Sequence, residues 1–259
     1  MKVLDLFSGL GGWAEPFRAR GHEVITLDFE PKFHCDITAD ILEWDPLSLP
    51  ASWIGADDLV IVASPPCEAF SVLQIGRSWT GPNDDPPHQP KTDQARLGVK
   101  IVERTREVID ILKPAFFVLE NPRAKLRKLP VVADLPRDTV SFCRYGLDFM
   151  KPTDLFGHFP PSWESRGVCD SRNAPLFKMD GRVWVTDRAN GNEPCHIQAV
   201  RGSTTGIQGK LSAAERAKIP FELALSICVA AELDLASGRV HDVSPSKSPV
   251  VEVGPLTLF

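Results

Sequence analysis

The first half of the chain alternates short, continuous apolar runs with segments whose apolar residues recur at helical spacing. Short apolar runs bounded by turn formers are typical of strands buried in a parallel sheet. The predicted strands are 2–7, 24–28, 59–63 and 115–119, the predicted helices are 13–20 and 97–112, and 35–37 is a weaker candidate element. Strands that alternate with helices predict an α/β fold with a doubly wound, mostly parallel sheet.

The pattern changes after residue 150. Residues 151–209 are rich in Pro, Gly, Asn and charged residues, which indicates a small irregular insertion rather than a further layer of the sheet. An amphipathic helix is predicted over about 213–235, with a break near Pro220. The sequence therefore predicts an α/β domain over 1–150, the insertion over 151–209, a helical segment over 210–235 that returns to the first domain, and a flexible tail over 236–259.

Composition is that of an ordinary globular chain, with 259 residues, 43% hydrophobic and 24% charged. It contains no apolar stretch of about 18 residues, so we expect no membrane-spanning helix. The amino terminus enters a strand pattern directly, without a signal-peptide layout. Six scattered cysteines form no small disulfide framework, which favours a reducing cytoplasm. A formal net charge of −5 argues against a general polyanion binder, although local basic patches matter more than the total.

A cysteine follows one of the predicted buried strands after two prolines. Pro65-Pro66-Cys67 comes just after the apolar run 59–63, and the prolines end the strand and stiffen the chain. Cys67 is therefore expected at the carboxyl edge of the sheet, where open α/β folds bind their ligands. A free cysteine is also a common small core residue, so Cys67 alone does not establish catalysis.

Two further segments are expected at the same edge. The glycine-rich turn 8–12 follows the first predicted strand, and Asp28 ends the second, where it could reach ribose hydroxyls of a nucleotide cofactor. The glycines fall at 9, 11 and 12, which does not match the G-x-G-x-x-G spacing of dinucleotide enzymes. Glu120-Asn121-Pro122 follows strand 115–119, where burial would raise the pKa of Glu120 towards a range useful for proton transfer. A capping or salt-bridging glutamate is the alternative reading.

These three segments together resemble a known family. Asp5-Leu6-Phe7-Ser8-Gly9-Leu10-Gly11-Gly12, Pro65-Pro66-Cys67 and Glu120-Asn121-Pro122 are similar to motifs I, IV and VI of the cytosine-C5 DNA methyltransferases, in the family's order. The segment from Ala217 to Glu232 resembles the family's closing motif. The resemblance implies a Rossmann-like class I methyltransferase fold and S-adenosylmethionine as methyl donor.

The resemblance also implies a role for each matched residue. Cys67 would attack carbon 6 of a cytosine flipped out of the duplex, which makes carbon 5 nucleophilic. Glu120 would hydrogen-bond ring N3 and the exocyclic amine. Asp28 would bind the cofactor's ribose, and Asp40-Ile41 would lie beside its adenine, with Asp36-Ile37 as the competing assignment. The other residues implied to contact the cofactor are Asp5, Phe7, Ser8, Gly9, Gly11, Gly12 and Pro65.

One family element is missing. Members carry a Gln-x-Arg-x-Arg run after a Tyr-Gly pair, whereas Tyr145-Gly146 is followed here by Lys151 at the place of the first arginine. Three cations are candidates for holding the cytosine O2, in the order of preference Lys151, Arg123 and Arg144. A lysine lacks the planar fork of arginine, so the contact would differ in geometry.

The implied partner is double-stranded DNA, bound by a monomer. The arginines of the short insertion suit phosphate contacts and a short recognition sequence, an arrangement that resembles bacteriophage-type members and points to restriction–modification or phage biology. Loop 76–94 would close over the DNA, with a plain surface loop as the alternative. The basic run 123–128 and loop 201–206 could contact phosphate, and the alternatives are a solvated helix face for the first and an ordinary turn for the second. A tRNA cytosine-5 methyltransferase and a catalytically silent DNA-binding relative are the alternatives.

Metal binding is not expected from the spacing of the cysteines. Cys169, Cys195 and His196 are weak zinc candidates, with Cys143 as a possible fourth ligand. A paired C-x-x-C is absent, and an adjacent Cys-His pair rarely binds one ion. Thiols buried in an irregular insertion are the favoured interpretation.

Overall fold

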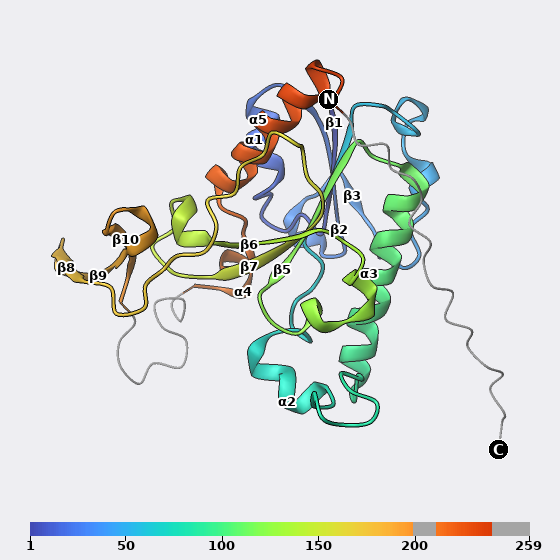
Figure 1. The fold of residues 1–259 in the computed structure, drawn as a ribbon. Helices are drawn as coiled ribbons and strands as arrows, with labels where there is room; N and C mark the ends of the chain where they lie inside the picture. The colour runs from blue at the N-terminus through green and yellow to red at the C-terminus, as the bar shows by residue number, and fades with distance from the viewer. Residues whose placement is uncertain (199–210, 240–259) are drawn as a thin grey trace.

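The computed structural model describes residues 1–198 and 211–239 and is built on a seven-stranded sheet (Figure 1). The strand order is β3-β2-β1-β4-β5-β7-β6, and β7 runs antiparallel to both of its neighbours while the other pairs are parallel. Its strands are β1 (Lys2–Leu6), β2 (Glu23–Asp28), β3 (Ile37–Thr38), β4 (Leu59–Ala63), β5 (Phe116–Pro122), β6 (Arg137–Ser141) and β7 (Pro152–His158). The predicted fold class, an α/β fold with a mostly parallel sheet, is confirmed.

Helices cover both faces of the sheet, as Figure 1 shows. Successive residues of a strand point to opposite faces, so Val3 packs with α1 and α5 on one face whereas Leu4 packs with α3 on the other. The longest helix, α3, begins at Asp93 rather than at residue 97, because the side chain of Thr92 caps it by accepting from the Ala95 amide. The helices are α1 (Ala14–Ala19), α2 (Ile75–Ser78), α3 (Asp93–Leu112), α4 (Ala213–Ala217) and α5 (Phe221–Ala236).

The predicted end of the first domain at residue 150 does not match the sheet. β7 lies between β5 and β6, so the sheet continues to residue 158 and the insertion begins after it. The sequence pattern did not indicate β7 because Thr153 and Asp154 are polar and yet buried. Asp154 is paired there with Arg127, whose Nε lies 2.8 Å from the carboxylate, which compensates the buried charge.

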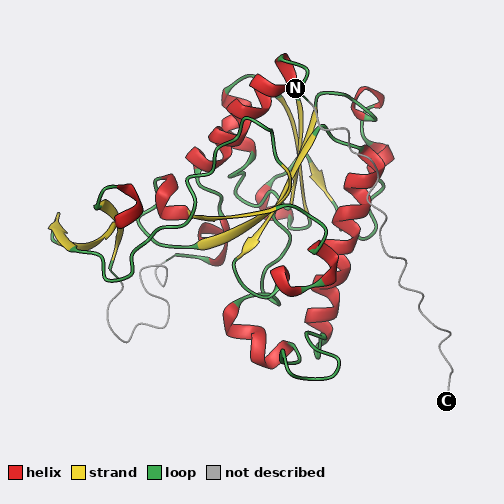
Figure 2. Cartoon of the chain, in the orientation of Figure 1, coloured by secondary structure: helices red, strands yellow, loops and turns green. Residues whose placement is uncertain are grey.

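The insertion is not irregular throughout. It holds a small antiparallel sheet, β10-β9-β8, that projects from the main sheet (Figure 2). Its strands are β8 (Leu176–Met179), β9 (Arg182–Asp187) and β10 (Glu193–Ile197). Residues 199–209 of the predicted insertion, with the loop 201–206, lie outside the described residues.

The carboxyl-terminal helical segment agrees with the predicted break, since Pro220 is the residue that precedes α5. Of the predicted tail, residues 240–259 lie outside the described residues. Within residues 1–198 and 211–239, no helix is both long and apolar enough to cross a bilayer.

Candidate active site

The carboxyl edges of β1, β2, β4 and β5 open onto one cavity of about 800 Å³. β4 and β5 are adjacent and in register, with Ala63 opposite Leu119, so the segments that follow them emerge side by side. Cys67 and Glu120 both line the cavity, together with residues of the glycine-rich turn. The structure therefore brings the three predicted segments to one place.

The loop that carries Cys67 is fixed to the neighbouring segment. The side-chain amide of Asn121 donates to the carbonyl oxygen of Pro65 at 3.1 Å, and Asn121 is fully buried. Amides of Phe70 and Ser71 both donate to the carbonyl of Cys67 at 3.0 Å, which forms a tight turn after it. Cys67 is thus held from both sides, and Asn121 is a positioning residue that the motif match had not singled out.

The environment of Cys67 disfavours its thiolate. Burial raises the pKa of the Cys67 thiol to about 11, the negative charge of Glu120 acts in the same direction, and the charge of Lys151 opposes both. The thiol is therefore protonated at neutral pH in the unliganded protein. A change in the charge around Cys67 on substrate binding would lower this pKa and favour the nucleophilic thiolate.

Glu120 has one carboxylate oxygen ready for a ligand. The side chain is 4% exposed, and its Oε1 accepts no hydrogen bond from any described residue. Lys151 Nζ lies 3.6 Å from that oxygen, and burial raises the pKa of Glu120 against the effect of this cation. The carboxyl group also bonds the hydroxyl of Ser64, which accepts from Trp13 Nε1 at 3.0 Å. A buried carboxylate oxygen that accepts no hydrogen bond from the protein points to a hydrogen bond with a bound molecule.

Lys151 reaches this site because β7 runs antiparallel. The amino end of an antiparallel strand lies at the same edge as the carboxyl ends of its parallel neighbours, and Lys151 immediately precedes β7. Its Nζ also stands 4.4 Å from the centroid of the Phe142 ring. Of the three predicted cations, Lys151 lines the cavity, whereas Arg123 and Arg144 do not. Arg144 is paired instead with Asp187, at 3.0 Å.

The other half of the cavity is formed by the glycine-rich turn and the end of β2. Phe7, Ser8, Gly9 and Gly12 line the cavity, as does Asp28. The Asp28 carboxylate accepts from the amides of Gly9 and Glu30, each at 2.9 Å, so it fixes the turn against β2 as well as facing the cavity.

Asp5 and Gly11 do not line the cavity, although the motif match implied cofactor contacts for both. Asp5 is fully buried behind the turn, where its carboxylate accepts from the Ser8 hydroxyl at 2.6 Å. Burial raises the pKa of Asp5 to about 7. Asp5 therefore positions the turn, and its contact with a cofactor stays a prediction.

Gly12 permits a close approach between the turn and the carboxyl-terminal segment. A Cβ at this position would lie 2.6 Å from the amide nitrogen of Ile219, which is too close for any side chain. Lys218 is ion-paired with Glu15 of α1 at 3.0 Å, and α4 contributes several residues to the cavity wall. The segment 213–219 thus closes the cavity from above the glycine-rich turn.

The structure separates the two candidates for an acidic–apolar pair. Asp40 and Ile41 line the cavity, whereas Asp36 accepts from the Thr26 amide at 2.8 Å and pairs with Arg18 outside it. Sequence reasoning missed Phe29, which lines the cavity with 64% of its surface exposed. Its signal was an aromatic residue directly after the acidic end of β2. An exposed planar ring beside a cavity can stack on a flat heterocycle.

The sequence is 30% identical over 181 residues to a probable DNA (cytosine-5)-methyltransferase of frog virus 3, and the match covers 65% of this chain and 78% of that protein. The chain belongs to the DNA (cytosine-5)-methyltransferase family. It is also 29% identical over 132 residues to the type II methyltransferase M.DdeI of Desulfomicrobium norvegicum, a match that covers 47% of this chain but 28% of that longer protein.

Among solved structures, the Entamoeba histolytica methyltransferase EhMeth aligns with a TM-score of 0.52 over 91% of this chain and 98% of that chain. At 11% sequence identity this likeness shows the fold alone. No family model matches the sequence.

The basic run 123–128 of this methyltransferase is partly occupied by contacts within the protein. Arg127 is held by buried Asp154, and Lys125 is 3% exposed. Lys125 Nζ lies 3.0 Å from His88 Nδ1 and 5.1 Å from the centroid of the Trp79 ring, so it fastens the loop before α3 to the core. Two of the four cations therefore have structural contacts, and the predicted phosphate contact stays a prediction for the exposed Arg123 and Lys128.

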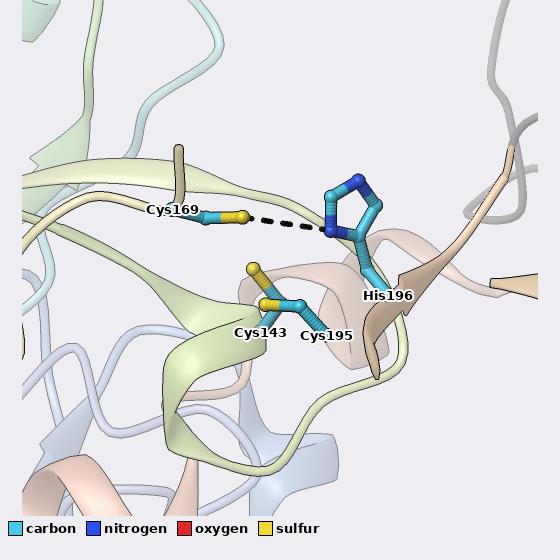
Figure 3. A group of neighbouring side chains, drawn as sticks. All are labelled: Cys143, Cys169, Cys195 and His196. Atoms are coloured by element: carbon cyan, nitrogen blue, oxygen red, sulfur yellow. Dashed lines mark hydrogen bonds between the residues drawn. The ribbon is translucent and has the colours of Figure 1, made fainter. Parts of the chain in front are cut away.

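The weak zinc candidates lie outside the cavity of the methyltransferase. Cys169, Cys195 and His196 converge with Cys143 beside the insertion (Figure 3). Cys169 and Cys195 are only partly buried, which departs from the expectation of thiols buried in an irregular insertion.

Proposed function

We propose that this chain transfers a methyl group from S-adenosylmethionine to carbon 5 of cytosine in double-stranded DNA, through a covalent bond from Cys67 to carbon 6. The main support is that Cys67, Glu120 and Lys151 share one cavity with the glycine-rich turn, and that Glu120 Oε1 accepts no hydrogen bond from the described residues, its ion-pair contact with Lys151 being 3.6 Å long. Membership of the family supports the same reaction.

The cofactor half of the cavity fits S-adenosylmethionine. The carboxylate of Asp28 can accept from ribose hydroxyls, the exposed ring of Phe29 can stack on adenine, and the turn at Gly9 offers backbone close to the ligand. Asp40 and Ile41 form the adjoining wall. When bound, the cofactor supplies an electrophilic methyl group.

The base half of the cavity fits cytosine through Glu120. Cytosine offers an acceptor at N3 beside a donor at its exocyclic amine. A protonated carboxyl offers the complementary donor and acceptor, and burial, which raises the pKa of Glu120, favours that form. A neutral Glu120 also removes the charge that raises the pKa of Cys67. Binding of the base would therefore promote formation of the thiolate.

The covalent step follows from this arrangement. The thiolate of Cys67 forms a bond to carbon 6, and the electron pair of the 5,6 double bond moves towards carbon 5, while Glu120 stabilises the charge on the ring. Lys151, whose charge lowers the pKa of Cys67, would stabilise the thiolate before attack and would contact the cytosine O2. After carbon 5 accepts the methyl group it loses its proton to a base, and Cys67 leaves, which restores the double bond. The cytosine must be flipped out of the duplex to enter the cavity.

The test is transfer of labelled methyl groups from S-adenosylmethionine to duplex DNA and, separately, to tRNA. We expect incorporation into DNA by the native chain and by Cys35→Ser, a matched change at a partly buried thiol that does not line the cavity. Cys67→Ser should lose the activity. Incorporation into tRNA alone would contradict the proposed substrate, and incorporation by Cys67→Ser at the native rate would contradict the proposed nucleophile.

A further inference from the structure

Three thiols and one imidazole from distant parts of the chain meet beside the small antiparallel sheet (Figure 3). Cys143 lies in the 3-10 helix Phe142–Tyr145 directly after β6, Cys169 lies in the loop after β7, and Cys195 and His196 belong to β10. The four ligand atoms all lie within 4.8 Å of one another. The group therefore joins the insertion to the edge of the catalytic sheet.

A β-bulge explains how adjacent residues contribute to the same group. In a regular strand, Cys195 and His196 would point to opposite faces. β10 pairs Pro194 with Thr186 and His196 with Val185, so Cys195 is an extra residue without a partner in the ladder. A bulge of this kind redirects the side chain of the extra residue. This removes the objection, raised by the spacing alone, that a neighbouring Cys and His rarely bind one ion.

The distances within the group are close to those of a tetrahedral zinc site. Zn–S bonds of about 2.3 Å and Zn–N bonds of about 2.0 Å place the ligand atoms of a tetrahedron about 3.5 to 3.8 Å apart. Cys169 Sγ and His196 Nδ1 are 3.8 Å apart. Every other separation in the group is at most 4.8 Å, so a contraction of no more than about 1 Å would complete the site.

The backbone around the group is already ordered by other contacts. The Cys169 amide donates to Ser141 Oγ at 3.1 Å, which fixes this ligand next to the end of β6. The Ile197 amide donates to the carbonyl of Asp148 at 2.8 Å, which fixes β10 beside the segment that follows Cys143. The ligands therefore come from backbone segments that are hydrogen-bonded to one another.

The small sheet lacks the apolar interior that would otherwise hold it. None of the hydrophobic clusters among the described residues includes a residue of β8, β9 or β10. The best-buried side chains of these strands are polar, namely Thr186, Asp187 and His196. The Asp187 carboxylate is ion-paired with Arg144, at 3.0 Å, and accepts hydrogen bonds from the amides of Asp170 and Ala189. Small units without a sufficient core are commonly stabilised by a structural metal.

We propose that Cys143, Cys169, Cys195 and His196 bind one zinc ion that fastens the β8–β10 sheet to the catalytic domain. Three thiolates and one imidazole are a typical set for a closed structural zinc site, which leaves no open position for substrate. The ion would order the insertion and take no part in methyl transfer. Its loss should affect DNA binding and the stability of the insertion more than the binding of S-adenosylmethionine.

The experiment measures zinc in the full-length chain after reconstitution with zinc chloride and removal of loosely bound metal. We expect about one zinc per chain in the native protein and in Cys35→Ser, and at least a five-fold lower content in Cys169→Ser and Cys195→Ser. Cys228 lies in a second group of possible metal ligands, with His22 and Glu232. Cys228→Ser should nonetheless retain the zinc, because Glu232 is already ion-paired with Arg20, at 2.6 Å.

A second measurement guards against loss of zinc through unfolding. His196→Cys should keep about one zinc per chain through four thiolates, whereas His196→Ala should lose it, with circular dichroism reporting the fold of both. Cobalt in place of zinc should give the intense visible bands of tetrahedral thiolate coordination in the native protein. A folded native chain that binds less than about 0.1 zinc would overturn the proposal. So would a disulfide between any two of the three cysteines in protein kept under reducing conditions.

Discussion

The charge of Glu120 and of Lys151 should change the reactivity of Cys67 in opposite directions. Glu120 raises the pKa of the thiol, and Lys151 lowers it. Glu120→Gln keeps the shape of the side chain and removes its charge, while Lys151→Met removes the cation and keeps most of the length. We expect the first variant to speed alkylation of Cys67 and the second to slow it.

The magnitude follows from the thiol's pKa, about 11 against the usual 9.0. A pKa higher by about 2 makes the thiolate roughly 100-fold rarer at neutral pH, which corresponds to about 3 kcal/mol in the free energy of ionisation. Burial is the largest cause, so neither variant restores the usual value. We expect each neighbouring charge to change the pKa of Cys67 by about 1, which predicts an alkylation rate about 10-fold higher in Glu120→Gln and about 10-fold lower in Lys151→Met.

The assay is the rate of Cys67 alkylation by iodoacetamide, followed by mass spectrometry of the Cys67 peptide between pH 7 and pH 11. The rate in the native chain should rise with pH up to about 11. The more reactive Glu120→Gln variant should nonetheless methylate DNA about 100-fold more slowly or worse, because its amide offers a donor and an acceptor but cannot transfer a proton to ring N3 as negative charge develops. Cys35, in the same samples, serves as an internal reference.

Two results would refute the electrostatic account of the site. One is an alkylation rate that changes in the same direction in both variants. The other is a native Cys67 that already reacts at its full rate at pH 7, since such a thiol would have a low pKa despite its burial.

Three further substitutions test the framework of the site. Gly12→Ala places a Cβ 2.6 Å from the Ile219 amide and should lower the free energy of unfolding in urea by about 1–3 kcal/mol, whereas Gly76→Ala, with open space around its Cβ, should change it by less than about 0.5 kcal/mol. The pKa of Asp5 is about 7 in the folded chain against 3.8 for an ordinary aspartate, so the stability that its protonated form contributes is complete below pH 4 and is lost as the pH rises through 7. Asp5→Asn cannot ionise. The free energy of unfolding of Asp5→Asn minus that of the native chain, measured in urea, should therefore be greater at pH 8 than at pH 4, by up to about 4 kcal/mol. Asn121→Ala removes a buried hydrogen bond from the loop of Cys67 and should lower kcat in steady-state DNA methylation about 10-fold, with unchanged binding of S-adenosylmethionine in calorimetry.

The sheet and its edge were predictable because their signals are local. Continuous apolar runs mark strands such as β4 and β5, and parallel strands bring their carboxyl ends to one edge, so Cys67 and Glu120 could be placed together from the sequence. The sequence ranks Lys151 above Arg144 only through its place after Tyr145-Gly146 in the family motif. The physical reason why Lys151 reaches the cavity is the antiparallel direction of β7, which no local pattern indicates.

Other features depend on contacts between distant segments. β7 carries buried Asp154, and its burial is possible only because Arg127 lies opposite. Asp5 matches a motif of cofactor-binding residues, yet it is buried behind the turn. The meeting of Cys143 with Cys195 follows from a bulge that leaves no mark in composition or spacing.

The central claim is that Cys67 bonds covalently to the target cytosine. Its most direct test is incubation of the chain with S-adenosylmethionine and duplex DNA that carries 5-fluorocytosine. Release of Cys67 requires carbon 5 to lose a proton, and because fluorine takes the place of that hydrogen the release is blocked and the covalent complex is trapped. We expect a stable protein–DNA adduct in the native chain, mapped by mass spectrometry to the Cys67 peptide, and none in Cys67→Ser. An adduct on another cysteine, or no adduct from a chain that methylates ordinary DNA, would contradict the account.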